Sequence, residues 1–244
     1  MGSPIIIVED LSKKYKDAEE FSLQHVSFTV SRGDKFGILG PNGAGKTTLI
    51  SIMCGIINSS GGLVKFNIPG ITEYNIGLVP QDYAFYNELT AYQNLEYFGV
   101  LYNMKKKEIR ERTEKILALL GLQNFAGKKV KTFSGGMKRR LNLAIGILHN
   151  PVILFLDEPT VGVDIQSRNA IIQFLNSLNE SGTTIIYTSH HLNEAEEFCN
   201  KIVLLDYGKI IAFDETEKLK EKNNSVSLTD VVLKLTGEAF RDDI

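Results

Sequence analysis

Hydrophobic residues form short continuous blocks along much of the chain, and polar segments separate them. Runs of strand length cover residues 5–9, 26–30, 34–39, 63–66, 76–79, 152–156, 184–187 and 202–205, and the runs at 152–156, 184–187 and 202–205 are continuous rather than alternating. Continuous apolar blocks are typical of strands that are buried on both faces, as in parallel sheets covered by helices on either side. The pattern therefore predicts an α/β fold with a mostly parallel core sheet.

The hydrophobic period becomes helical after Gln81. Thr90 and Gln93 have the spacing of a capping box at the start of a helix. Residues 108–120 place their apolar positions on one helical face. We therefore expect one domain over residues 1–244, with a core from 1–81 and 151–222, a helical insert at 82–150 and a helical tail at 223–244.

Composition narrows the functional classes. The chain has 244 residues, of which 43% are hydrophobic, and this suits one α/β domain. The 27 basic and 29 acidic residues nearly balance, so no nucleic-acid partner is expected. Cys54 and Cys199 lack metal-ligand spacing and indicate a reducing compartment. No apolar block approaches the roughly 20 residues that a membrane-spanning helix needs, so we expect no segment of this sequence to cross a membrane.

Residues 40–48 fit the phosphate-loop pattern G-x-x-x-x-G-K-S/T. An apolar block precedes them and a helical pattern follows, which argues against a chance glycine-rich turn. The glycines let backbone N–H groups surround a phosphate chain. We expect Lys46 to contact the β- and γ-phosphates of ATP, and the Thr47 hydroxyl to bind Mg²⁺. The predicted nucleotide-binding residues here are Gly40, Pro41, Asn42, Gly43, Ala44, Gly45, Lys46, Thr47 and Thr48.

Two adjacent acids, Asp157 and Glu158, end the apolar block at 152–156. Neighbouring residues at the end of a strand point to opposite sides, so the two side chains should have different roles. We expect Asp157 to hold Mg²⁺ through water, and Glu158 to orient or deprotonate the attacking water.

A Ser134-Gly135-Gly136 turn precedes a helical pattern whose apolar positions are Leu141, Ala144, Ile145 and Leu148. The N-terminus of a helix presents N–H groups and a positive dipole, so it can bind an anion. These residues alone also fit an ordinary helix cap.

The order of the phosphate loop, the S-G-G turn and the L-D-E-P-T segment at 156–160 resembles the ATP-binding subunit of an ABC transporter. The resemblance extends from residue 5 to about residue 237. It implies a P-loop NTPase core, an N-terminal antiparallel β-subdomain and an inserted α-helical subdomain. It also implies a head-to-tail dimer, in which the S-G-G turn of one subunit caps the γ-phosphate held by its partner. A membrane-spanning transporter subunit would anchor that dimer at the cytoplasmic face of the membrane.

The same resemblance implies roles for four further residues. Tyr15 would stack on adenine, and Gln81 would sense both Mg²⁺ and the attacking water. Asp164 lies in the segment after the L-D-E-P-T strand. His190 would lie near the γ-phosphate, because T-S-H followed by E-A-E matches residues 188–190 and 194–196. The neighbouring His191 is the alternative for this role.

The turn departs from the commonest family sequence, L-S-G-G-Q, at Phe133 and Met137. The segments at 134–141, 158–164 and 228–237 resemble the ATPases of bacterial exporters for antibiotics, drugs and related compounds, and subunits for sodium, polysaccharide or motility-linked export share these features. Two alternatives come from other classes. A soluble ABC ATPase acting on ribosomes or DNA usually carries two cassettes or a long coiled coil. A P-loop kinase or GTPase would not need the S-G-G turn, and the GTPase motif N-K-x-D is absent from the sequence.

An aromatic stretch follows Gln81 and contains Tyr83, Phe85 and Tyr86. Aromatic residues are favoured anchors at protein interfaces. The stretch could either bind a cytoplasmic helix of the membrane subunit or pack the helical insert onto the core.

Overall fold

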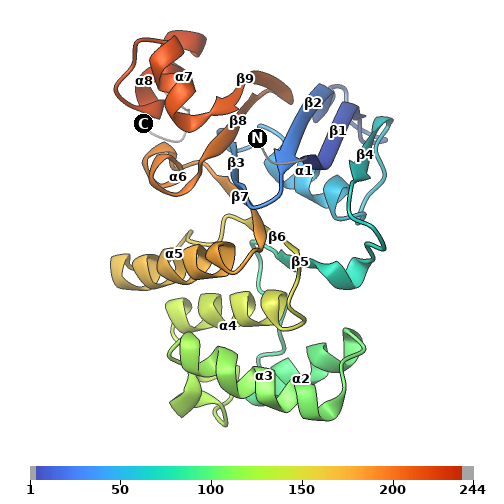
Figure 1. The fold of residues 1–244 in the computed structure, drawn as a ribbon, viewed down its shortest axis with the longest axis vertical. Coiled ribbons are helices and arrows are strands. Elements are labelled where there is room, and N and C mark those ends of the chain that lie inside the picture. The colour runs from blue at the N-terminus through green and yellow to red at the C-terminus, as the bar shows by residue number, and fades with distance from the viewer. Residues whose placement is uncertain (1–3, 238–244) are drawn as a thin grey trace. The chain divides into compact units, whose positions relative to one another are not determined.

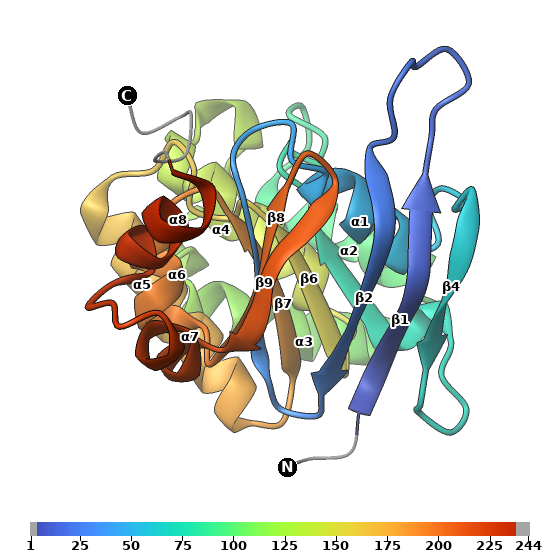
Figure 2. The same ribbon diagram turned by 90° about the horizontal axis from the view of Figure 1, so that it is seen from above.

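The computed structural model describes residues 4–237 and divides into two compact units. The first unit comprises Met1–Ile71 and Thr184–Ile244, and the second comprises Thr72–Thr183. Figures 1 and 2 show the elements of both units. The residues of the predicted tail beyond 237 lie outside the described residues.

The N-terminal part of the first unit is a three-stranded antiparallel sheet with the order β2-β1-β4. Its strands are β1 (Pro4–Lys13), β2 (Leu23–Ser31) and β4 (Gly61–Phe66). Ile6 of β1 pairs with Val30 on one side and with Phe66 on the other. The three strands lie side by side in Figure 2. The antiparallel β-subdomain implied by the resemblance is confirmed.

The central strand of the first unit is β3 (Lys35–Leu39). It lies between β7 (Thr184–Ser189) and β8 (Lys201–Asp206) and is parallel to both. Residues 36–39 of β3 are buried, which explains their continuous apolar sequence. The last strand, β9 (Lys209–Glu215), was not predicted and runs antiparallel to β8. The helices of this unit are α1 (Lys46–Met53), α6 (Leu192–Phe198), α7 (Thr216–Lys222) and α8 (Leu228–Thr236).

The second unit contains the parallel pair β5 (Ile76–Val79) and β6 (Ile153–Asp157). Its helices are α2 (Ala91–Leu101), α3 (Lys106–Leu119), α4 (Gly135–Ile147) and α5 (Ile165–Glu180). Short 3₁₀ turns occupy Glu73–Asn75, Gln123–Phe125 and Val130–Thr132. Helices α2, α3 and α4 pack together, as Figure 1 shows. The predicted α-helical insertion between strands is therefore confirmed.

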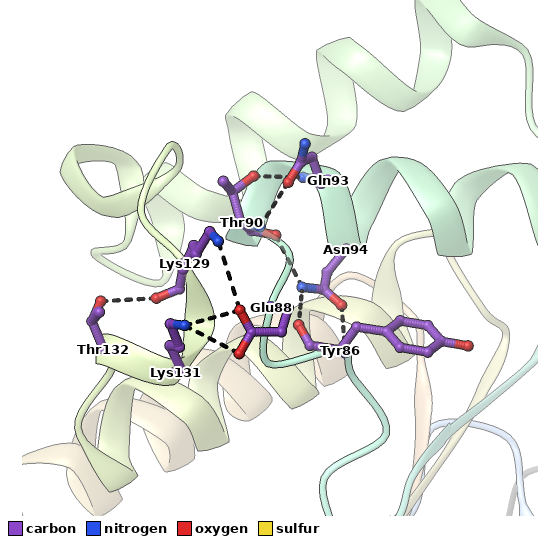
Figure 3. A network of polar contacts seen from close by, with 8 residues as sticks. All are labelled: Tyr86, Glu88, Thr90, Gln93, Asn94, Lys129, Lys131 and Thr132. Atoms are coloured by element: carbon purple, nitrogen blue, oxygen red, sulfur yellow. Dashed lines mark hydrogen bonds and ion pairs between the residues drawn. The ribbon is translucent and has the colours of Figure 1, made fainter.

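The capping box at the start of α2 forms as predicted (Figure 3). The Thr90 hydroxyl accepts a hydrogen bond of 3.1 Å from the amide of Gln93, and the Thr90 amide donates one of 2.9 Å to the Gln93 side chain. The next residue, Asn94, is fully buried and bonds to both backbone groups of Tyr86. These contacts fix the aromatic stretch to the first turn of α2.

A second set of contacts fixes the same stretch to the segment that leads into α4. The Glu88 carboxylate lies 2.9 Å from the Lys131 ammonium and 3.6 Å from that of Lys129 (Figure 3). Backbone hydrogen bonds from Val130 to Leu89 and from Lys131 to residue 87 run alongside this ion pair. Segments about 40 residues apart in sequence therefore form one connected region of the second unit.

Within residues 4–237, no helix is both long enough and apolar enough to span a bilayer.

Candidate nucleotide-binding site

The phosphate loop connects β3 to α1 in the first unit. Gly45 is the residue before α1, has a φ of 104° and provides no side-chain cap. A Cβ atom at Gly45 would lie 2.5 Å from the carbonyl oxygen of Ser22, so only glycine fits this turn. No acidic side chain lies in the first turn of α1, so no carboxylate of that turn would repel an anion at the helix N-terminus.

Lys46 directs its ammonium group back into the loop. Its Nζ donates hydrogen bonds of 2.8 Å to the Gly40 carbonyl and 3.0 Å to the Pro41 carbonyl, and the residue is 5% exposed. A Cβ atom at Gly43, whose φ is 80°, would meet no atom within 4 Å. A buried ammonium, a glycine backbone with open space beside it and a helix N-terminus together fit a polyphosphate chain.

Tyr15 lies beside the first turn of α1. Its hydroxyl is 3.4 Å from the Thr48 hydroxyl, and its ring is 44% exposed. The Lys13 ammonium lies 5.1 Å from the centre of the same ring. An exposed aromatic face next to the phosphate loop is the arrangement that stacking on a nucleobase requires.

The turn between β8 and β9 supports the phosphate loop from the neighbouring strand. The Gly208 amide donates a hydrogen bond of 3.1 Å to the Ala44 carbonyl, and the Gly208 carbonyl accepts one of 2.8 Å from the Gln24 amide. This turn therefore ties the loop to β2. Sequence analysis did not identify it.

His190 lies at the same edge of the sheet as the phosphate loop. Leu39 of β3 pairs with Ser189 of β7, so Gly40 and His190 are the next residues of two neighbouring parallel strands. His190 is half-buried, whereas His191 is exposed and directly precedes α6. The centres of the two rings are 4.0 Å apart. The strand register therefore places His190 directly after β7, level with the first residue of the phosphate loop.

The acidic pair lies in the second unit, where Asp157 is the last residue of β6. Asp157 is 4% exposed and Glu158 is 5% exposed. Glu158 has a φ of 48°, a left-handed conformation that is uncommon for a residue with a side chain. The Val161 amide donates a hydrogen bond of 3.3 Å to the Glu158 carbonyl and closes a turn there.

Gln81 follows β5, and its side chain is exposed. The Asn142 side chain of α4 holds the neighbouring backbone, because it donates to the Pro80 carbonyl at 3.0 Å and accepts from the Ala84 amide at 3.1 Å. The segment around Gln81 is thereby attached to the helix that follows the S-G-G turn.

Ser134 directly precedes α4, so the helix starts where the sequence predicted. Its hydroxyl accepts a hydrogen bond of 3.3 Å from the Met137 amide, so the side chain is a helix cap. Gly135 and Gly136 form the first turn of the helix, which contains no acidic residue. The structure therefore combines the cap with the exposed helix N-terminus that anion binding needs.

Asp164 caps the next helix, α5. Its carboxylate accepts hydrogen bonds from the Ser167 amide at 2.9 Å and from the Ser167 hydroxyl at 2.8 Å, and these bonds lower the pKa of Asp164 below its ordinary value. A Cβ atom at Gly136 would lie 2.4 Å from the Ser167 hydroxyl oxygen and 3.5 Å from the Asp164 carboxylate. The start of α4 therefore packs closely against the start of α5.

The predicted Mg²⁺ ligands are divided between the units. Thr47 lies in the first unit, and Gln81 and Asp157 lie in the second. A hydroxyl, a carboxamide and a carboxylate are the oxygen ligands that Mg²⁺ prefers. Across residues 4–237, no group of three or more histidine, cysteine, aspartate or glutamate side chains could hold a metal by itself.

A phosphate loop between a buried parallel strand and a helix, together with an acidic pair at the end of β6, defines a P-loop nucleoside triphosphatase. The sequence model of the ABC transporter family matches residues 23–161. A similar curated protein is the linearmycin resistance ATP-binding protein LnrL of Bacillus subtilis (strain 168). The two are 38% identical over 238 residues, which cover 95% of this chain and 76% of LnrL.

Solved structures give the same assignment. An ATP-binding subunit of an ABC transporter has a TM-score of 0.85 and 26% identity, covering 95% of this chain and 99% of that one. A dimeric ATP-binding cassette in a post-hydrolysis state, bound to ADP and Pi, has a TM-score of 0.78 and 28% identity. The match covers 86% of this chain and 98% of that one. The chain belongs to the ABC transporter family, as an ATP-binding subunit that hydrolyses ATP. This assignment favours the transporter interpretation over a soluble ATPase of ribosomes or DNA.

Proposed function

We propose that this subunit hydrolyses ATP with Mg²⁺ to drive export through a separate membrane-spanning partner. The observation that carries the proposal is the Lys46 ammonium, which is buried inside a glycine loop at the N-terminus of α1. LnrL, a resistance protein, supports export as the direction of transport. The subunit would lie in the cytoplasm, attached to the membrane through that partner.

Each predicted site residue has a role in this proposal. Residues 40–48 hold the phosphates, and Lys46 neutralises the charge that develops on their oxygens. Thr47, Gln81 and Asp157 hold Mg²⁺, which supplies further charge neutralisation when bound. Glu158 accepts a proton from the attacking water, and Gln81 and His190 hold that water and the γ-phosphate in position. Tyr15 stacks on the adenine.

We also propose the division of the chain that the sequence suggests. Residues 1–81 and 151–222 form the catalytic core with its β-subdomain, residues 82–150 form the helical subdomain, and residues 223–244 form a C-terminal tail. Helix α8 supports the tail assignment over the part of it that the structure describes.

The active form would be a head-to-tail homodimer. Its two ATP molecules would each lie between the phosphate loop of one copy and the Ser134-Gly135-Gly136 turn of the other, with Asp164 close to that turn. The exposed N-terminus of α4 supports this arrangement, because it carries no acidic residue in its first turn and such a helix end can bind an anion. A twofold axis would make both sites complete at once.

ATP should therefore convert the Glu158→Gln protein from monomer to dimer in the presence of Mg²⁺. Sedimentation velocity with and without ATP measures this change. Ser134→Arg, added to that variant, should block the dimer through its bulk while the monomer still binds ATP. Ser227→Arg is a matched control, because Ser227 also caps a helix, α8, and this change should leave the dimer intact. A protein that fills its ATP site and stays monomeric would rule out the shared-site arrangement.

The aromatic stretch after Gln81 is the proposed contact with the membrane subunit. Tyr83 is 42% exposed and Tyr86 is 51% exposed, although the rings of Tyr83 and Phe85 stack at 5.0 Å. The contacts in Figure 3 bind the backbone of Tyr86 to Asn94, and the nearby Glu88 to Lys131. A segment held in this way, with exposed rings, is well suited to bind a short helix.

Alanine at Tyr83, Phe85 or Tyr86 should reduce transport strongly while ATPase activity without the partner stays near normal. The measurements are ATPase activity of the isolated subunit and transport in cells that contain the membrane partner. Tyr74→Ala is the control, because Tyr74 is similarly exposed, at 43%, and lies in the same unit but outside the stretch in sequence. Normal transport by all three folded variants would show that these rings only pack the insert.

A further inference from the structure

Arg139 is a buried charged residue that connects three separate segments of the second unit. It lies on α4 and is 5% exposed. One end nitrogen, Nη1, donates a hydrogen bond of 2.7 Å to the Gln81 carbonyl. The other, Nη2, donates one of 3.1 Å to the Val161 carbonyl. A single guanidinium thus joins the segment after β5 to the loop after β6.

The same guanidinium also contacts the aromatic stretch. Its Cζ atom lies 5.2 Å from the centre of the Tyr83 ring, within cation–π range. The Tyr83 hydroxyl donates a weak hydrogen bond of 3.4 Å to the Gly135 carbonyl, in the first turn of α4. Arg139 and Tyr83 therefore pack together beside the S-G-G turn.

The position of Arg139 is costly for stability. Burial lowers the pKa of its guanidinium, although Tyr83, Asp82 and Glu158 partly offset this effect. Its Nε is buried and has no hydrogen-bond partner among residues 4–237. A buried charge with an unsatisfied donor is weak evidence for a stabilising role, because desolvation can exceed the attraction that it gains. A role in the chemistry accounts better for such a residue.

The acceptor at Val161 belongs to the turn that holds Glu158. That turn keeps Glu158 at a φ of 48°, and the Val161 amide closes it on the Glu158 carbonyl. A left-handed conformation persists only where surrounding contacts enforce it. Arg139 donates a hydrogen bond to the carbonyl of this same Val161 and so restrains the turn. Its bond to the Gln81 carbonyl restrains the backbone of Gln81 at the same time.

We propose that Arg139 is a positioning residue for ATP hydrolysis. From α4, the helix that Ser134 caps, it holds Gln81 and the turn of Glu158 in fixed positions relative to each other. The inference rests on the proposed roles of Gln81 and Glu158. Arg139 itself does not touch the nucleotide in this proposal. Its loss should therefore slow the chemical step and leave ATP binding, which depends on the phosphate loop of the first unit, nearly unchanged.

The test compares Arg139→Met with Arg112→Met. Arg112 is a matched control in the same unit, because burial lowers the pKa of its guanidinium and its two donors bind the Ile147 and Leu148 carbonyls, away from the proposed chemistry. We expect Arg139→Met to lower kcat by about 10- to 100-fold, as a small displacement of catalytic groups does, with KM for ATP nearly unchanged. Arg112→Met should keep both constants.

Arg139→Lys provides the second variant, since lysine keeps the charge but cannot form the two-pronged contact. It should fold, keep the KM and show a kcat between those of the wild type and the methionine variant. Wild-type kcat in both Arg139 variants would overturn the inference, and so would equal losses of kcat in Arg139→Met and Arg112→Met. Glu158→Gln distinguishes failure of the proposed role of Glu158 from failure of the role of Arg139. If Glu158→Gln hydrolyses ATP at the wild-type rate, the proposed role of Glu158 is wrong; if it loses hydrolysis while Arg139→Met keeps the wild-type kcat, only the role of Arg139 is wrong.

Discussion

Replacing Lys46 by alanine is expected to abolish most ATP binding and to lower hydrolysis by at least about 100-fold, because no other residue of the loop carries a positive charge. The Lys46 ammonium lies inside the loop on the Gly40 and Pro41 carbonyls, where the phosphates would be held. The measurements are the affinity for ATP by calorimetry, and phosphate release.

Two further variants show whether the loss comes from removing the Lys46 charge or from disturbing the fold. Lys46→Met keeps the length of the buried side chain and removes only the ammonium, so it should lose ATP as Lys46→Ala does. Lys65→Ala removes an exposed lysine that pairs with Glu9 in the antiparallel sheet, and it should behave as wild type. Near-normal turnover by a folded Lys46→Ala protein would show that the loop does not bind the phosphates.

Glu158→Gln is expected to retain ATP and to lose hydrolysis by about 10²- to 10⁴-fold, the range that a general base contributes. Glutamine has nearly the same shape, so the turn at Glu158 and its φ of 48° should persist. The carboxamide cannot take a proton from water at neutral pH, whereas Asp157 is still present to hold Mg²⁺. Single-turnover hydrolysis and nucleotide affinity, measured on the same preparation, distinguish the two effects.

Glu111→Gln is the control for the change in charge, because Glu111 is exposed on α3 and forms an ion pair with Lys107 one turn away on the same helix. It should hydrolyse ATP normally. If Glu158→Gln lost ATP binding and hydrolysis in proportion, Glu158 would serve the bound nucleotide rather than the water, and the assignment of the base would be wrong.

Sequence reasoning predicted most of the core sheet, because buried parallel strands need continuous apolar blocks and this chain has them. It missed β9, whose residues are mostly half-buried and whose antiparallel pairing with β8 leaves no such block. The sequence did contain one sign of this hairpin, the glycine at position 208 in the turn between β8 and β9. In the structure Tyr207 and Gly208 both have positive φ, at 45° and 71°, as tight hairpin turns require.

The phosphate loop and the acidic pair could be located from sequence because each is a short contiguous motif with a required neighbourhood. Arg139 could not be located in this way, since its partners Gln81 and Val161 lie 58 and 22 positions away along the chain. One clue was present: the helical pattern places Arg139 one turn before Leu143, among the buried residues of α4. An arginine on a buried helical face requires carbonyl partners from other segments.

The hydrogen bond from the Gly208 amide to the Ala44 carbonyl gives the protein an intrinsic probe of its own nucleotide loop. Because this N–H group belongs to the turn between β8 and β9, its exchange with deuterated solvent depends on whether the loop releases it. It lies outside the 40–48 motif, so it can be followed in variants that alter the motif. A single backbone resonance could thus report when the loop tightens around a nucleotide and when it relaxes.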